Sequence, residues 1–148
     1  MAGNRIIYIR EKVQQLTTQP YSTLTLPYQL RIKHTQRNYL DNEEDVILAL
    51  PQGTRLYDGD LLRSEDDLII QVKSATEPVY QACATDSLSL FQACYYLGLR
   101  HIPSQIANNA VFYQDNERAA PIMEQLDFEV KQVDAVFEPM PMQLQAQR

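Results

Sequence analysis

The sequence predicts an α+β protein in which a small N-terminal β domain precedes a ferredoxin-like βαββαβ domain. Two observations carry this prediction. Residues 22–73 contain short runs of alternating apolar and polar residues that end at turn-forming residues, a pattern typical of strands. Beyond a boundary near residues 74–78, strand and helix periodicities follow one another. The expected parts are a β domain over residues 1–74, the βαββαβ domain over residues 75–139 and a flexible tail over residues 140–148.

In the β domain, strands are expected wherever apolar and polar residues alternate, and turns wherever residues that tolerate a tight or left-handed backbone interrupt them. The predicted strands cover residues 6–9, 23–26, 28–33 and 68–72, and the predicted turns cover residues 41–42, 51–53 and 58–60. Residues 17–20 are expected to form a loop.

The second domain is predicted element by element. A strand over residues 79–83 leads to Asp86, which suits the N-cap of a helix, and Gly98 suits its C′ end. In this helix Leu90, Ala93, Cys94 and Leu97 share one face. A hairpin is expected over residues 102–113 with its turn at Asn108 and Asn109, then a helix over residues 119–126 and a strand over residues 128–133. Pro121 must lie in the first turn of that helix. The resulting order, β-α-β-β-α-β, is the ferredoxin-like arrangement.

Composition and charge exclude several classes of function. The net charge of −6 disfavours a surface that binds nucleic acid and is compatible with cations or basic partners. No apolar run approaches the ~20 residues that span a bilayer, and the first residues lack a secretory pattern, so we expect a cytoplasmic protein without membrane contact. Cys83 and Cys94 form no CxxC motif, so reduced, buried thiols are expected.

One segment resembles a known family. Residues 98–103 read Gly-Leu-Arg-His-Ile-Pro, which is similar to the Gly-x-Arg-His-x-Pro stretch of the UreE family of urease accessory proteins. Residues 24–33 resemble the opening β hairpin of that family, residues 48–60 its Leu-Pro-x-Gly-Thr and Asp-Gly-Asp stretch, and residues 137–139 its closing Phe-x-Pro-like end. These segments occur in the order and spacing of the family over roughly residues 22–139.

The resemblance implies a dimeric nickel chaperone whose β domain is available for protein contacts. His101 from both protomers would bind Ni²⁺ as cargo at the dimer interface, where Zn²⁺ or Cu²⁺ would compete. The partners implied are the urease accessory GTPase and the urease apoprotein complex. The chain departs from many members, which carry histidines where it has Tyr96, Asp115 and Glu117, and a histidine-rich tail where it has none.

Considered without the family, one histidine after a helix is more often structural than a metal ligand. Neutral imidazole does suit nickel, copper and zinc, and a two-fold axis would bring together two copies of His101. Asp115 and Glu117 would add oxygen ligands on one side if residues 113–117 stay extended. The alternative for these two acids is a solvated loop at a helix start. His34 is expected at the surface, within a basic segment at residues 31–37 that offers a docking patch.

Two other functions stay open. A metal-independent assembly adaptor for urease accessory proteins is the main alternative, because the auxiliary histidines are missing. The enzyme alternative is a small hydrolase using Arg100 and His101. The sequence has no phosphate-binding glycine loop, nucleophile elbow or HExxH motif, so we expect a protein that is not an enzyme.

Overall fold

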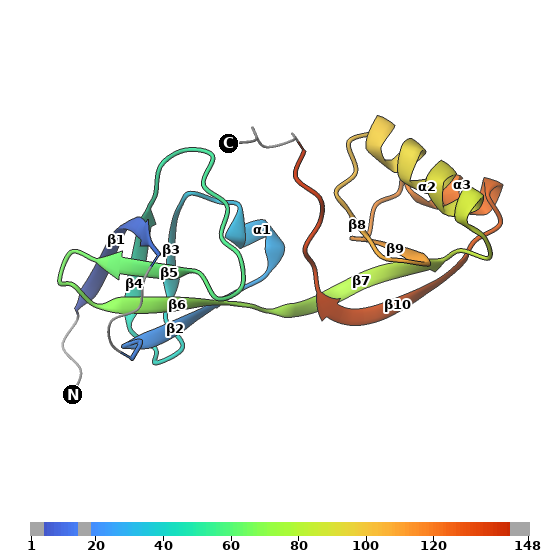
Figure 1. Ribbon diagram of the computed structural model, residues 1–148. Coiled ribbons are helices and arrows are strands. Elements are labelled where there is room, and N and C mark those ends of the chain that lie inside the picture. The colour runs from blue at the N-terminus through green and yellow to red at the C-terminus, as the bar shows by residue number, and fades with distance from the viewer. Residues whose placement is uncertain (1–4, 15–18, 143–148) are drawn as a thin grey trace. The chain divides into compact units, whose positions relative to one another are not determined.

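Ten strands and three helices form in the residues that the computed structural model describes, 5–14 and 19–142. They are β1 (Ile6–Val13), β2 (Ser22–Leu26), α1 (Tyr28–Arg31), β3 (Thr35–Tyr39), β4 (Asp45–Ala49), β5 (Leu61–Ser64), β6 (Ile69–Ser74), β7 (Thr76–Cys83), α2 (Ser87–Leu99), β8 (Ser104–Ile106), β9 (Ala110–Tyr113), α3 (Ala120–Gln125) and β10 (Glu129–Val136). The chain divides into two units, residues 1–75 and 76–148, and each has its own sheet (Figure 1).

The first unit is a six-stranded sheet in the order β2-β6-β5-β1-β4-β3. The β1/β4 and β2/β6 pairs are parallel, and the other neighbours are antiparallel. Alternate strand residues point into one core, because successive side chains of a strand lie on opposite faces. That core contains Ile7, Ile9, Leu24, Leu26, Leu40, Val46, Leu48, Leu50, Leu56, Leu62, Ile70 and Val72. The predicted turns form, with Gly53 at φ +86° and Gly59 at φ +87°.

The prediction of a strand over residues 28–33, and with it an opening hairpin over residues 24–33, is wrong. β2 ends at Leu26 and pairs with β6, and Tyr28–Arg31 form the short helix α1. Pro27 explains the change, because proline has no N–H to donate to a strand partner, while its carbonyl accepts the N–H of Leu30 at 3.1 Å. Arg31 is fully buried and donates from Nε to the carbonyl of Leu26 at 3.2 Å, so it is not available to the predicted docking patch.

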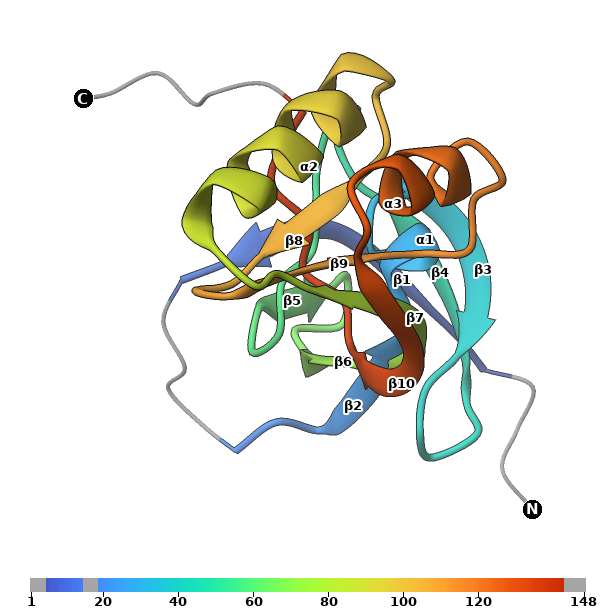
Figure 2. The ribbon, with the colours of Figure 1, turned by 90° about the vertical axis from the view of Figure 1, so that its right-hand side faces the viewer.

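The second unit has the ferredoxin-like order of elements, β7-α2-β8-β9-α3-β10, as predicted. Its four strands form an antiparallel sheet in the order β10-β7-β9-β8. Both helices cover the same face of this sheet (Figures 1 and 2). The core between helices and sheet contains Ala82, Leu90, Ala93, Leu97, Ile102, Val111, Tyr113, Ala119, Ile122 and Met123.

Several local predictions for this unit are confirmed. The carboxylate of Asp86 caps α2 by accepting the N–H of Ser89 at 2.8 Å. Hydrogen bonding to Ser89 lowers the pKa of Asp86. The β8–β9 hairpin turns at Asn108 and Asn109, where Ala107 N–H donates to the carbonyl of Ala110 at 2.8 Å. Pro121 lies in the first turn of α3. Among the described residues, no helix is long and apolar enough to cross a membrane.

The predicted tail begins at a residue that is attached to the sheet. Met140 N–H donates to the carbonyl of Ser104 at 2.8 Å, and Glu138 N–H donates to Oε1 of Gln105 at 2.9 Å. Residues 137–140 therefore lie along β8. Residues 143–148 of the tail, and residues 17–18 of the predicted loop near the N-terminus, lie outside the described residues.

Candidate functional site

His101 occupies the corner that connects α2 to β8. Arg100 is the C-cap of α2, and His101 follows it with φ at +56°. His101 N–H donates to the carbonyl of Gly98 at 3.0 Å, and Ile102 N–H donates to the carbonyl of Leu97 at 3.0 Å. These two bonds are the Schellman motif, in which the C′ residue adopts the left-handed conformation.

Gly98 was predicted at the C′ position, but it lies inside α2. The physical reason is packing: Leu97 and Ile102 are both buried in the same core, the contact that accompanies a Schellman end. If the helix ended at Gly98, Ile102 would no longer lie against Leu97 in this core. The left-handed residue is therefore a histidine, held at the surface by two backbone hydrogen bonds.

His101 lines a cavity of about 330 Å³ on the second unit. We call it the His101 cavity, and its lining consists of Cys94, Gly98, His101, Ile102, Ser104, Ile106, Met140, Pro141 and Met142. Cys94 is half-buried, and burial raises the pKa of its thiol. Among the described residues that line this cavity none is charged, and their side chains offer an imidazole, a thiol, a hydroxyl and two thioethers.

The two acids predicted to supplement His101 line other cavities of the chain. β9 ends at Tyr113, and the chain turns at residues 117–119 instead of staying extended. Asp115 lines a cavity of about 340 Å³ with Tyr80 and Tyr113. Burial, with contributions from Tyr80 and Asp115, raises the pKa of Tyr113 to about 12. Within one chain, therefore, Asp115 and His101 line different cavities.

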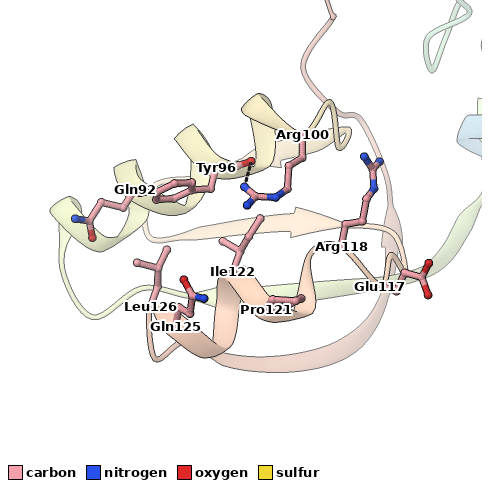
Figure 3. A pocket seen from close by; sticks show the side chains of 9 residues that line it. All are labelled: Gln92, Tyr96, Arg100, Glu117, Arg118, Pro121, Ile122, Gln125 and Leu126. Atoms are coloured by element: carbon pink, nitrogen blue, oxygen red, sulfur yellow. Dashed lines mark hydrogen bonds between the residues drawn. The ribbon is translucent and has the colours of Figure 1, made fainter.

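Glu117 lines a third cavity of about 530 Å³ between α2 and α3, the α2–α3 cavity (Figure 3). Arg100 and Tyr96 also line it, and Arg100 Nη1 donates to the carbonyl of Tyr96 at 3.5 Å. Arg100 thus belongs to a different cavity from His101. The pair that the hydrolase alternative needs does not converge on one site.

Among the described residues, no group of three or more His, Cys, Asp or Glu side chains is arranged to hold a metal ion. His34, predicted at the surface, is half-buried in the first unit, where its carbonyl accepts the N–H of Leu50 at 2.9 Å. His101 is the one histidine of the second unit.

The exposed side of α2 carries large apolar side chains along its whole length, from Leu88 in the first turn to Leu99 beside the His101 corner. Leu88, Phe91, Tyr95 and Leu99 recur at intervals of three or four residues and are each 60–66% exposed. We call this set the α2 apolar face. Residues spaced in this way line one side of a helix. The spacing was visible in the sequence, but only the buried face of the helix was interpreted there.

The structure thus adds two features to the sequence-predicted site. Met140 and Met142, predicted to lie in a flexible tail, line the His101 cavity, and the α2 apolar face reaches the same helix end at Leu99. The signal for the first was the pair of thioethers itself, since two methionines flanking a proline are unusual in a polar tail. Their proximity to His101 depends on the path of the chain along β8.

The comparisons with known proteins cover both units. Residues 5–75 match the model of the UreE urease accessory protein N-terminal domain, and residues 77–147 match that of its C-terminal domain. The chain is 37% identical over 117 residues to the urease accessory protein UreE of Burkholderia lata, covering 79% of this chain and 56% of that protein. It is also 37% identical over 116 residues to UreE of Cupriavidus pinatubonensis, covering 78% of this chain and 52% of that protein.

The chain therefore spans a little over half the length of these curated relatives. Both relatives carry the name of an accessory protein and not of an enzyme, in agreement with the expectation of no catalytic site. With a match to both domain models in the order of the two units, the chain belongs to the UreE family of urease accessory proteins.

Proposed function

We propose that this protein is a nickel metallochaperone that binds Ni²⁺ between two protomers through His101 and delivers it during urease assembly. The observation that carries the proposal is the position of His101, an exposed imidazole held at the end of α2 in a member of the UreE family. Neutral imidazole is a suitable ligand for Ni²⁺. The resemblance to nickel chaperones supplies the identity of the cargo, and Zn²⁺ or Cu²⁺ would compete for the same ligand.

The proposal requires a homodimer joined through the second unit, because one imidazole per chain does not make a tight site. The α2 apolar face supports this requirement. Exposed apolar patches of this kind mark association surfaces on soluble proteins, and a symmetric dimer brings the same residue twice to its axis. A second copy of the chain that covers the C-terminal end of this face, around Tyr95 and Leu99, would bring the two α2 corners, and with them two His101 side chains, near each other.

Two imidazoles leave coordination positions on nickel that water or the ligands of a partner can fill, which suits transfer more than storage. Asp115 and Glu117 line other cavities of the same protomer, so they serve as ligands only if the partner protomer supplies them. The proposed recipients are the urease accessory GTPase and the urease apoprotein complex. The first unit is the proposed surface for protein contacts, and the cytoplasm is the proposed compartment.

The test is a titration of the whole chain with Ni²⁺ by calorimetry, with the oligomeric state measured by light scattering. The expected result is a dimer that binds about one tight ion per dimer, as a shared site on a two-fold axis requires. Acidification should weaken binding, because a protonated imidazole cannot bind metal. His34→Ala serves as the control and should leave stoichiometry unchanged.

The alternative is a metal-independent adaptor that holds urease assembly partners together. The histidines absent at Tyr96, Asp115 and Glu117 favour it. The same titration separates the two functions, since a chain that fails to bind Ni²⁺ at micromolar concentration but still associates with urease accessory proteins is an adaptor.

A further inference from the structure

The His101 cavity collects soft ligand atoms from three separate segments of the chain. Cys94 comes from the middle of α2, His101 from the corner after it, and Met140 and Met142 from the segment beyond β10. Sulfur-containing residues therefore line the cavity both from a helix and from a segment about forty residues further along the sequence. The chain has four methionines and two cysteines in all, so half of each sulfur type lines this one cavity.

The segment that carries the two methionines is anchored beside the cavity. Phe137 is fully buried, and the backbone N–H groups of Glu138 and Met140 bond to Gln105 and Ser104 of β8. Ser104 itself lines the cavity. Met140 is thus held at the rim by its own backbone, and Met142 follows it by two residues, with Pro141 limiting the backbone between them.

Both methionines are partly accessible to solvent, since Met140 is 52% exposed and Met142 is 58% exposed. Thioether sulfur is a soft, uncharged ligand that needs no deprotonation, and soft sulfur ligands select Cu(I) over the harder divalent ions. The described residues of the lining include no carboxylate, lysine or arginine. A monovalent ion loses less hydration energy than a divalent ion when it enters such an uncharged, partly apolar site.

We propose that the His101 cavity binds one Cu(I) ion per protomer, with the thioethers of Met140 and Met142 and the imidazole of His101 as its ligands. Cys94 completes the set as a thiol that releases its proton to solvent and becomes a thiolate when the metal binds. The inference shares His101 with the proposed nickel site but does not depend on it, because the thioethers distinguish the two ions. Cu(I) bound here would exclude Ni²⁺ from the same imidazole.

The experiment titrates the full chain with Cu(I) without oxygen, using bathocuproine disulfonate as a coloured competitor and ascorbate as reductant. The wild type should withdraw one equivalent of Cu(I) per protomer from the competitor. The double variant Met140→Leu/Met142→Leu keeps the apolar side-chain volume but removes both thioethers, and should weaken the apparent Cu(I) affinity by about tenfold or more. Its Ni²⁺ binding should stay within about twofold of the wild type, because Ni²⁺ does not require thioether ligands.

Met123→Leu is the matched control, because Met123 is buried in the core of the same unit and does not line the His101 cavity. It should compete for Cu(I) as the wild type does. Circular dichroism of each variant establishes that the second unit is folded.

The proposal is overturned if the wild type does not take Cu(I) from the competitor, or if the double leucine variant competes as well as the wild type. If the same protein still binds Ni²⁺, either result contradicts the Cu(I) proposal alone and not the nickel proposal. Conversely, loss of Ni²⁺ binding with retained Cu(I) binding would contradict the nickel proposal alone.

Discussion

Replacing His101 by glycine separates its action as a metal ligand from its place in the backbone. An L-residue in the left-handed conformation costs roughly 1–2 kcal/mol, less for histidine than for most residues. Glycine removes this cost, but it also makes the unfolded chain more flexible, which lowers the free energy of unfolding by about 0.4–1 kcal/mol. The expected net result is a second unit that is unchanged or up to about 1 kcal/mol more stable, although it has lost its imidazole.

His101→Ala makes the informative partner variant. It also removes the imidazole, but alanine keeps the left-handed cost, so it should be about 1 kcal/mol less stable than His101→Gly. For a unit of this size that difference moves the midpoint of thermal unfolding by about 4–8 °C. Circular dichroism melts measure it directly. If both variants lose the tight Ni²⁺ site in calorimetry while their stabilities differ in this way, the loss of binding comes from the imidazole and not from a weakened fold.

Asp127 supplies a matched control within the same unit. It follows α3 with φ at +61°, its N–H donates to the carbonyl of Glu124, and Phe128 N–H donates to that of Met123, so α3 ends in the same motif as α2. Asp127→Gly should stabilise the unit to a similar extent and leave Ni²⁺ binding unchanged. The metallochaperone reasoning is refuted if His101→Gly binds Ni²⁺ with the affinity and stoichiometry of the wild type.

Four further outcomes follow from the same structure. Phe91→Glu should convert the dimer to monomers by light scattering, whereas Tyr39→Glu, at an equally exposed position of the first unit, should not. A fragment of residues 76–148 should fold by circular dichroism and bind Ni²⁺. Deleting residues 140–148 should leave Ni²⁺ stoichiometry unchanged, because they contain no histidine, cysteine or carboxylate side chain. The raised pKa of Tyr113 should make stability fall as pH rises from about 10 to about 12, and Tyr113→Phe should reduce that fall in alkaline denaturation.

Much of the fold was predictable because local signals and tertiary packing agree in the second unit. The N-cap at Asp86, the turn at Asn108 and Asn109, and Pro121 at a helix start each act over four residues or fewer. The βαββαβ order then leaves few ways to form the sheet. The fold of the first unit was harder to predict, because its parallel β1/β4 and β2/β6 pairs join segments far apart in sequence. In addition, the residues of α1 belong to a run of alternating apolar and polar residues that is typical of a strand.

The sequence allowed His101 to be predicted as the candidate site residue, but not the residues that surround it. His101 stood out because of its motif, whereas its backbone conformation depended on the register of Leu97 and Ile102 in the core. The position of Met140 depended on a hydrogen bond to Ser104, a contact between residues 36 positions apart that no local pattern encodes. Asp115 and Glu117 separated because the chain turns after β9, and spacing by two predicts one shared side only for an extended chain.

The comparison of the two helix ends shows which property sets the candidate site apart. His101 and Asp127 occupy the same position of the same motif, so a left-handed residue alone does not mark function. Asp127 has neither sulfur ligands nor an exposed apolar helix face beside it, because α3 buries Ile122 and Met123 in the core. His101 has both, with Cys94 and two thioethers around its cavity and the α2 apolar face on the same helix. The proposed nickel site needs an accessible imidazole beside a surface for a second copy, and this corner places His101 at the end of the helix that carries the α2 apolar face.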